Sequence, residues 1–128
     1  MTARETIYAL LSTDLELADL GIAEDDIYNI EAVDNPERGK PFLVTAWADG
    51  PPVFGGRGRR DLLVWVHDDS ADYARIDAVL ERVRTLLVGI VHEGAISQVA
   101  FTGGSPDLYD DGFRTITRNY GFRVNGLG

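Results

Sequence analysis

The sequence predicts an α+β fold in which two helices pack on one face of a mostly antiparallel, mixed β-sheet of four to five strands. Two observations support this prediction. Apolar residues between Ser70 and His92 recur at spacings of three, four and seven, which is typical of an amphipathic helix. Segments rich in β-branched and aromatic residues precede and follow that helix. The expected order is α-β-β-β-α-β-β, and because neither a repeat nor a linker divides the chain, we expect residues 1–128 to form a single domain.

The predicted long helix needs a flat apolar surface to cover, because its apolar side chains lie in one stripe. Residues 61–67, directly before it, are predicted to form a strand with both faces at least partly covered. Asp68, Asp69 and Ser70 are expected to cap the first turn, and His92 to lie at the carboxyl end, where the helix dipole favours positive charge. The apolar stripe comprises Ile76, Val79, Leu80, Val83, Leu86, Leu87 and Ile90.

A first helix is predicted from residue 3 to about residue 19. Thr2 and Glu5 have the spacing of a capping box, in which the hydroxyl and the carboxylate satisfy free amides of the first turn. Gly21 is expected to end the helix, because glycine adopts the left-handed conformation that follows many helices.

Two irregular segments are expected between the strands. Residues 49–58 and 103–112 are rich in glycine, proline and aspartate, and the first is long for a connection between adjacent strands, which usually takes about 2–5 residues. Long loops of this kind are either mobile or reserved for a partner. The strands are predicted at residues 27–33, 42–47, 61–67, 96–102 and 113–124.

Composition and charge exclude several classes of function. The 128 residues include 21 acidic and 12 basic side chains, for a net charge of −9, so tight nonspecific binding to nucleic acid is disfavoured. The absence of cysteine excludes disulfides and thiolate metal sites. No apolar run approaches the roughly 20 residues that cross a bilayer, and no signal-peptide pattern begins the chain. We therefore expect synthesis in a cytoplasm and no membrane partner.

The two histidines are the first candidates for chemistry. His67 and His92 each have carboxylates nearby in sequence, at Asp68, Asp69 and Glu93, so a metal site or an acid–base site is conceivable. Helix-capping acids, with a histidine at a helix carboxyl terminus, explain the same residues without a site. The second interpretation is favoured.

The glycine-rich segments do not form catalytic motifs. Residues 55–60 precede a strand and lack the lysine and following helix of a phosphate-binding loop. Residues 103–106 include Ser105 but no strand-to-helix turn, so they do not form a nucleophile elbow. We therefore expect no catalytic residue, no cofactor and no metal, and the protein is not predicted to be an enzyme.

A basic segment and an acidic segment are the candidate protein-interface residues. The arginines near Phe54 are explained by solvated charge, by a protein contact of the hot-spot type, or, least favoured in so acidic a chain, by a nucleic-acid contact. If the acidic segment of one copy met the basic segment of the next, the contact would be head-to-tail and could close into a ring. The candidate residues are Phe54, Arg57, Arg59 and Arg60 in the basic segment, and Asp107, Tyr109, Asp110 and Asp111 in the acidic one.

The chain as a whole resembles the tail terminator (tail completion or minor tail) proteins of long-tailed bacteriophages. The resemblance lies in the layout: a helix begins almost at Met1, a long Gly/Pro/Arg loop joins two central strands, an amphipathic helix spans residues 72–92, and a strand at 113–124 ends the chain. It covers nearly all of the sequence but includes no short diagnostic motif.

This resemblance implies a virion structural protein without a cofactor. Such protomers form a homo-hexameric ring on the head-proximal end of the tail tube, end tube polymerisation and provide the surface for head–tail joining. The implied partners are further copies of the chain, the major tail tube protein and a head–tail connector or neck protein. DNA would pass through the ring without tight binding. Two alternatives remain: a neck or head-completion protein of the same virion, and a small ligand-binding or metal-dependent enzyme that uses His67 and His92.

Overall fold

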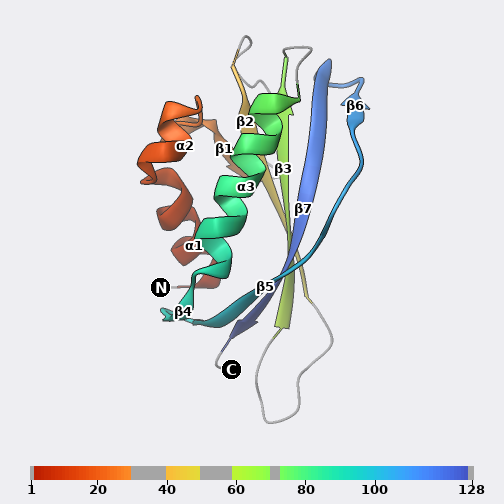
Figure 1. The fold of residues 1–128 in the computed structure, drawn as a ribbon. Coiled ribbons are helices and arrows are strands. Elements are labelled where there is room, and N and C mark those ends of the chain that lie inside the picture. The colour runs from red at the N-terminus through yellow and green to blue at the C-terminus, as the bar shows by residue number, and fades with distance from the viewer. Residues whose placement is uncertain (1, 30–39, 50–58, 70–72, 127–128) are drawn as a thin grey trace.

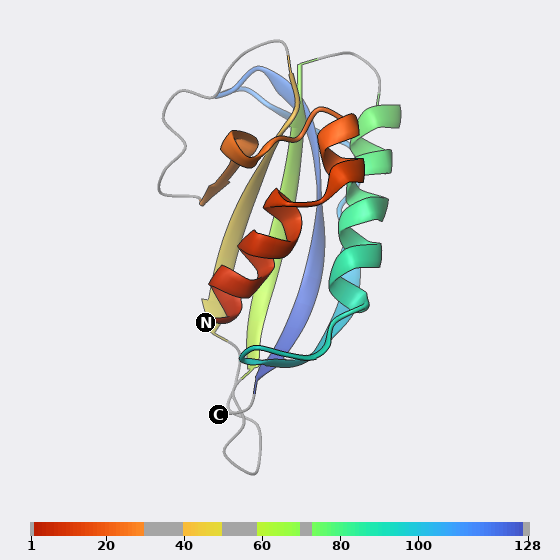
Figure 2. The same ribbon diagram turned by 90° about the vertical axis from the view of Figure 1, so that its left-hand side faces the viewer.

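Helices cover one face of a twisted sheet, as Figures 1 and 2 show from two sides. The structure is a computed structural model that describes residues 2–29, 40–49, 59–69 and 73–126. It confirms the predicted α+β class, the mostly antiparallel sheet and the placement of the helices on one face. Three α-helices are present in the described residues rather than two: α1 (Ala3–Ser12), α2 (Leu15–Asp19) and α3 (Ala74–Val88).

The predicted first helix is broken in two at Asp14. Thr2 caps α1 as expected, since its hydroxyl accepts a hydrogen bond from the Glu5 amide at 3.1 Å. Asp14, however, adopts an extended conformation and caps α2 by accepting a 3.0 Å hydrogen bond from the Leu17 amide. Gly21 then has a φ of +98°, the left-handed conformation expected after a helix.

The long helix is shorter than predicted at both ends. Asp68 does not cap it: this carboxylate ends a strand, is fully buried, and accepts two hydrogen bonds of 2.7 and 2.8 Å from the Arg75 guanidinium. Tyr73 occupies the N-cap position, and Ser70 lies outside the described residues. At the other end the helix stops at Val88, so the placement of His92 at its carboxyl terminus was wrong.

The described residues form a seven-stranded sheet, where four to five strands were expected. The spatial order is β1-β2-β3-β7-β5-β4, and β6 also pairs with β7. Among these described pairs, only β1 and β2 run parallel, and the others are antiparallel. The strands are β1 (Ile27–Asn29), β2 (Phe42–Asp49), β3 (Arg59–Asp68), β4 (Val91–Glu93), β5 (Ile96–Gly104), β6 (Leu108–Asp110) and β7 (Thr115–Gly126).

Two short strands account for the difference from the prediction. β4 contains His92 at a φ of 50°, where the long helix was expected to continue. β6 lies within residues 103–112, which were expected to be irregular, and pairs with the beginning of β7. β7 itself starts at Thr115 rather than at residue 113, because Arg114 has a φ of 57° and belongs to the preceding turn. The predicted strand at residues 27–33 is described only as far as residue 29.

The core lies between α3 and the central strands. α3 packs against β3, β5 and β7, and α1 and α2 pack against α3. Five of the seven residues of the predicted apolar stripe, Ile76, Val79, Leu80, Val83 and Leu87, are fully buried on α3. Leu86 is only partly buried, and Ile90 is buried but lies beyond the end of the helix. No helix in the described part of the chain is long and apolar enough to cross a membrane.

Shortening Leu80 to alanine should destabilise the protein by about 2–5 kcal/mol, because the side chain is fully buried and its removal leaves a cavity. Urea unfolding monitored by circular dichroism measures this change. Val88→Ala is the matched control on the same helix: Val88 is 45% exposed, so the loss should stay within about 0.5 kcal/mol. Equal losses from the two variants would mean that the helix is oriented differently.

Candidate protein-interaction site

Six of the eight predicted interface residues lie in the described part of the chain; Phe54 and Arg57 do not. Arg59 and Arg60 are the first residues of β3, and both are half-buried. The acidic residues and Tyr109 lie on β6 and the turns beside it. We call residues 107–111 the acidic segment.

The basic residues and the acidic segment do not meet within one copy. Arg59 is paired with Asn125 of β7, whereas Asp110 is paired with Thr115 of the same strand. Ten residues of β7 separate these two positions, which corresponds to about 33 Å along an extended strand. The two groups are therefore too far apart to neutralise each other, and a pairing between them would have to join different copies.

Arg60, near the start of β3, lies against Trp47, which lines a groove beside α1. The Arg60 guanidinium lies 4.7 Å from the centre of the Trp47 ring, and that of Arg4 lies 6.0 Å from it. Both distances suit a cation–π contact. Arg59 forms an ion pair with Asp61, in which Nη2 lies 3.4 Å from Oδ1. The groove has a volume of about 470 Å³ and a mostly apolar wall, formed by Arg4, Glu5, Ile7, Tyr8, Leu11, Ile27, Thr45 and Trp47.

The acidic segment presents apolar side chains as well as carboxylates. Leu108 is 37% exposed and Tyr109 is 61% exposed, although both belong to a strand. Asp107 and Asp111 are exposed, while Asp110 accepts a 2.8 Å hydrogen bond from the Phe113 amide and so fixes the turn into β7. Exposed tyrosine is enriched at protein interfaces, so Tyr109 makes this segment a candidate protein contact.

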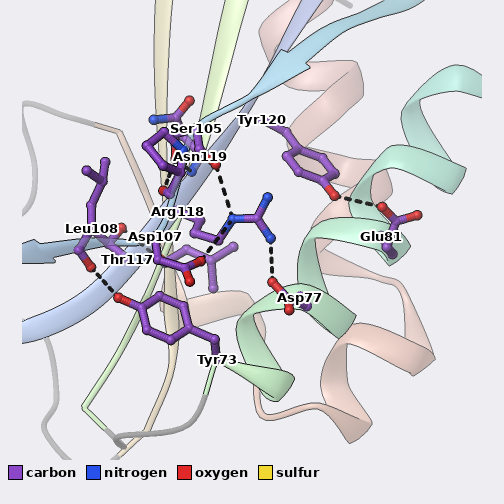
Figure 3. Close-up of polar contacts among 12 residues, drawn as sticks. Tyr73, Asp77, Glu81, Ser105, Asp107, Leu108, Thr117, Arg118, Asn119 and Tyr120 are labelled. Carbon is purple, nitrogen blue, oxygen red and sulfur yellow. Dashed lines mark hydrogen bonds and ion pairs between the residues drawn. The ribbon is translucent and has the colours of Figure 1, made fainter.

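A network around Arg118 holds this segment in place (Figure 3). Arg118 of β7 reaches across to Asp77 of α3, and its Nε donates a 3.2 Å hydrogen bond to the Ser105 carbonyl. The same Nε lies 3.7 Å from Asp107 Oδ1. Burial alone would lower the pKa of Arg118, but hydrogen bonding and charge at Asp77 raise it overall, so the cation is retained.

Two further hydrogen bonds complete the support. The Tyr73 hydroxyl, just before α3, donates a 2.7 Å bond to the Leu108 carbonyl of β6. Ser105 Oγ accepts a 2.9 Å bond from the Asn119 amide. This role of Arg118 has no signal in the sequence, because the residues involved come from three separate segments.

His67 lies in an aromatic cluster on the face of the sheet opposite the helices. Its ring stacks on Phe42 at 4.8 Å, and Phe113 contacts it edge-on at 5.2 Å. Nδ1 is 2.9 Å from the Thr115 hydroxyl. Burial lowers the pKa of His67 to about 4, against a smaller raising effect of Asp110, so the ring is neutral at pH 7. This environment fits a packed core residue.

The two imidazoles do not form a common site. His67 is paired with Thr117 of β7, whereas β4, which contains His92, is paired with β5 beside residue 125 of β7. His92 is also exposed, whereas His67 is 4% exposed. Within the described residues, no group of three or more histidine, aspartate or glutamate side chains could hold a metal ion.

Comparisons with known proteins identify a solved structure of similar fold. Neither a protein-family model nor a curated protein matches the sequence. Among solved structures, the fold is similar to that of a chain from the virion of a native gene transfer agent (GTA) particle, with a TM-score of 0.73 and 21% sequence identity. The likeness covers 95% of this chain and 92% of that chain. The two chains therefore share a fold over nearly their full lengths.

Replacing Arg118 with glutamine should loosen residues 103–110 without unfolding the protein, because it removes the contacts to Asp77 and Asp107. Hydrogen–deuterium exchange of peptides covering this region should accelerate about tenfold, equivalent to roughly 1.4 kcal/mol of local opening. Arg123→Gln, an exposed arginine on the same strand, is the control and should leave the exchange unchanged. Equal exchange in the two variants would remove Arg118 from this role.

The buried His67 should make stability depend on pH between about 6.5 and 4. Its folded-state pKa is depressed, so the unfolded chain binds the proton first, and stability is complete above pH 6.5 and falls as the pH drops towards 4. The full effect is about 3 kcal/mol. Urea unfolding at pH 7.5 and at pH 4 measures how much free energy of unfolding is lost on acidification. This loss should be about 3 kcal/mol smaller for His67→Gln than for the unaltered protein. Parallel losses would show that His67 is not buried as described.

Proposed function

We propose that this chain is a structural protein of a phage-like virion. Within that class we assign it as the tail terminator, and we take residues 1–128 as a single domain. The observation that carries the proposal is the likeness in fold to a chain of a gene transfer agent virion, over nearly the full length of both chains. The layout of the sequence, which resembles the tail terminators, supports the finer assignment.

In the proposed role, six copies form a ring on the head-proximal end of the tail tube. The ring ends tube polymerisation against the major tail tube protein and offers its other surface to a connector or neck protein. Arg59, at the start of β3, and Asp110, in the acidic segment, lie about 33 Å apart on one protomer. This separation supports head-to-tail association, in which different surfaces of successive copies meet.

The charge of the chain suits a ring through which DNA slides. Each copy has a net charge of −9, so six copies would carry 6 × −9, or −54, before any pairing at the interfaces. Carboxylates facing a bore repel phosphates, so DNA would pass without being held. The same charge opposes association of the copies, and the contacts must therefore bury apolar surface or pair arginines with carboxylates locally.

A non-catalytic role agrees with the geometry of the two histidines. One is buried in an aromatic cluster and the other is exposed at a sheet edge, so the enzyme alternative has no common site to use. The proposal therefore includes no cofactor.

Deleting the gene from the particle that encodes it should give tails of irregular length and heads without tails, because nothing would stop the tube or join it to the head. Electron microscopy of the particles measures both effects, and expression of the unaltered protein from a plasmid should restore normal particles. Tails of uniform length that fail to join heads would instead assign the protein to the neck. Normal, joined particles would contradict a structural role in the tail and neck.

A further inference from the structure

We propose that the acidic segment of one copy docks into the groove between α1 and β2 of the next copy. The inference rests on the proposed function only in requiring that copies of the chain associate. It assigns the two surfaces that meet, and with them the partner chemistry of the groove: an extended segment with an aromatic side chain and flanking carboxylates.

The groove has the properties that such a segment needs. Its wall is mostly apolar, with Ile7 and Leu11 of α1 buried at its base and Trp47 of β2 also lining it. Tyr8, at 42% exposure, is an accessible residue of the wall. A volume of about 470 Å³ lies within the range of about 300–1,000 Å³ that is usual for binding pockets. The groove can therefore take apolar side chains from a partner.

Charge selects an acidic occupant. The guanidinium groups of Arg4 and Arg60 both lie against the Trp47 ring. The acid in the wall, Glu5, accepts a 3.1 Å hydrogen bond from the Thr2 hydroxyl. Arg4 and Arg60 thus place two guanidinium groups at the Trp47 side of the groove, where the carboxylates of an incoming segment can approach them.

The acidic segment is presented in a form that is ready to bind. Tyr109 is 61% exposed and stands between the exposed carboxylates of Asp107 and Asp111. The backbone behind it is already fixed by pairing with β7 and by the hydrogen bond from Tyr73 to Leu108. Because the segment is ordered before it binds, little conformational entropy remains to be lost on docking.

The two surfaces lie on opposite sides of the protomer. The groove lies beside β1 and β2 at one edge of the sheet, whereas β6 pairs with β7 on the side away from β3 (Figure 1). A contact between unlike surfaces leaves one groove and one segment free in every open chain of copies. Such a contact is satisfied throughout only when a ring closes.

Cross-linking between single-cysteine variants tests the docking directly, because the chain has no cysteine of its own. Tyr8→Cys marks the groove, and Asp111→Cys marks the end of the acidic segment while leaving Tyr109 in place. A short thiol-to-thiol maleimide should link the two variants only when they are mixed. A protein carrying both cysteines should give a ladder of linked copies that stops at the size of the ring.

Controls separate this contact from chance encounters. In the control reaction, Val88→Cys, on the exposed face of α3, is mixed with Tyr8→Cys in place of Asp111→Cys. This mixture should give at least about tenfold less cross-linked product. Cross-linking of Asp111→Cys to itself would indicate a twofold contact and overturn the proposal. If light scattering shows that the protein assembles but the Tyr8→Cys and Asp111→Cys variants do not cross-link, the docking would be overturned but the proposed function would not. A monomer at every concentration, also with tail tube protein present, would contradict both.

Charge reversal provides a second test that needs no cysteine. Arg4→Glu and Asp111→Arg should each raise the concentration needed for half-assembly by about tenfold or more, and the double variant should recover most of that loss. Arg4 is exposed in the first turn of α1, where an acidic side chain suits the helix dipole, so the fold should persist. Arg123→Glu and Asp19→Arg make the same charge changes elsewhere. Failure of the double variant to recover while both controls assemble normally would overturn the docking.

Discussion

Burial of one face of α3 against the sheet is the constraint on which the rest of the structure depends. Its apolar side chains contact β3, β5 and β7, strands that come from both halves of the chain. The exposed Asp77 and Glu81 of the same helix extend towards β7, where they contact Arg118 and Tyr120. A single helix thus closes the core and also supplies the polar contacts that position the acidic segment.

Ion pairs fix the parts of the fold that the core does not hold. Arg82 of α3 makes two hydrogen bonds of 2.7 and 3.0 Å to Asp14, and this pairing lowers the pKa of Asp14. Arg75 of α3 similarly pairs with Asp68 at the end of β3, and Asp77 of α3 pairs with Arg118 of β7. Each pair joins α3 to a different neighbour, so this helix orients the rest of the molecule through charge as well as through apolar packing.

Structural features that depend on local sequence patterns could be predicted from the sequence. The periodicity of the long helix identified its buried face, including Leu80, and segments rich in β-branched and aromatic residues located the long strands. The break at Asp14 escaped prediction because its partner Arg82 lies 68 residues away. Asp68 was assigned to a helix cap because a carboxylate before a helix has the same sequence signal whether it caps the helix or pairs with an arginine. β6 was missed because three residues form a strand only where another strand offers an edge.

The central claim is that copies of this chain associate through unlike surfaces into a closed ring that caps a tail tube. Electron microscopy of the purified protein mixed with assembled tail tubes tests it most directly. The account predicts a ring of one layer, with cyclic symmetry, bound at one end of each tube. Open filaments of the protein, twofold dimers, or tubes with both ends bare would contradict it.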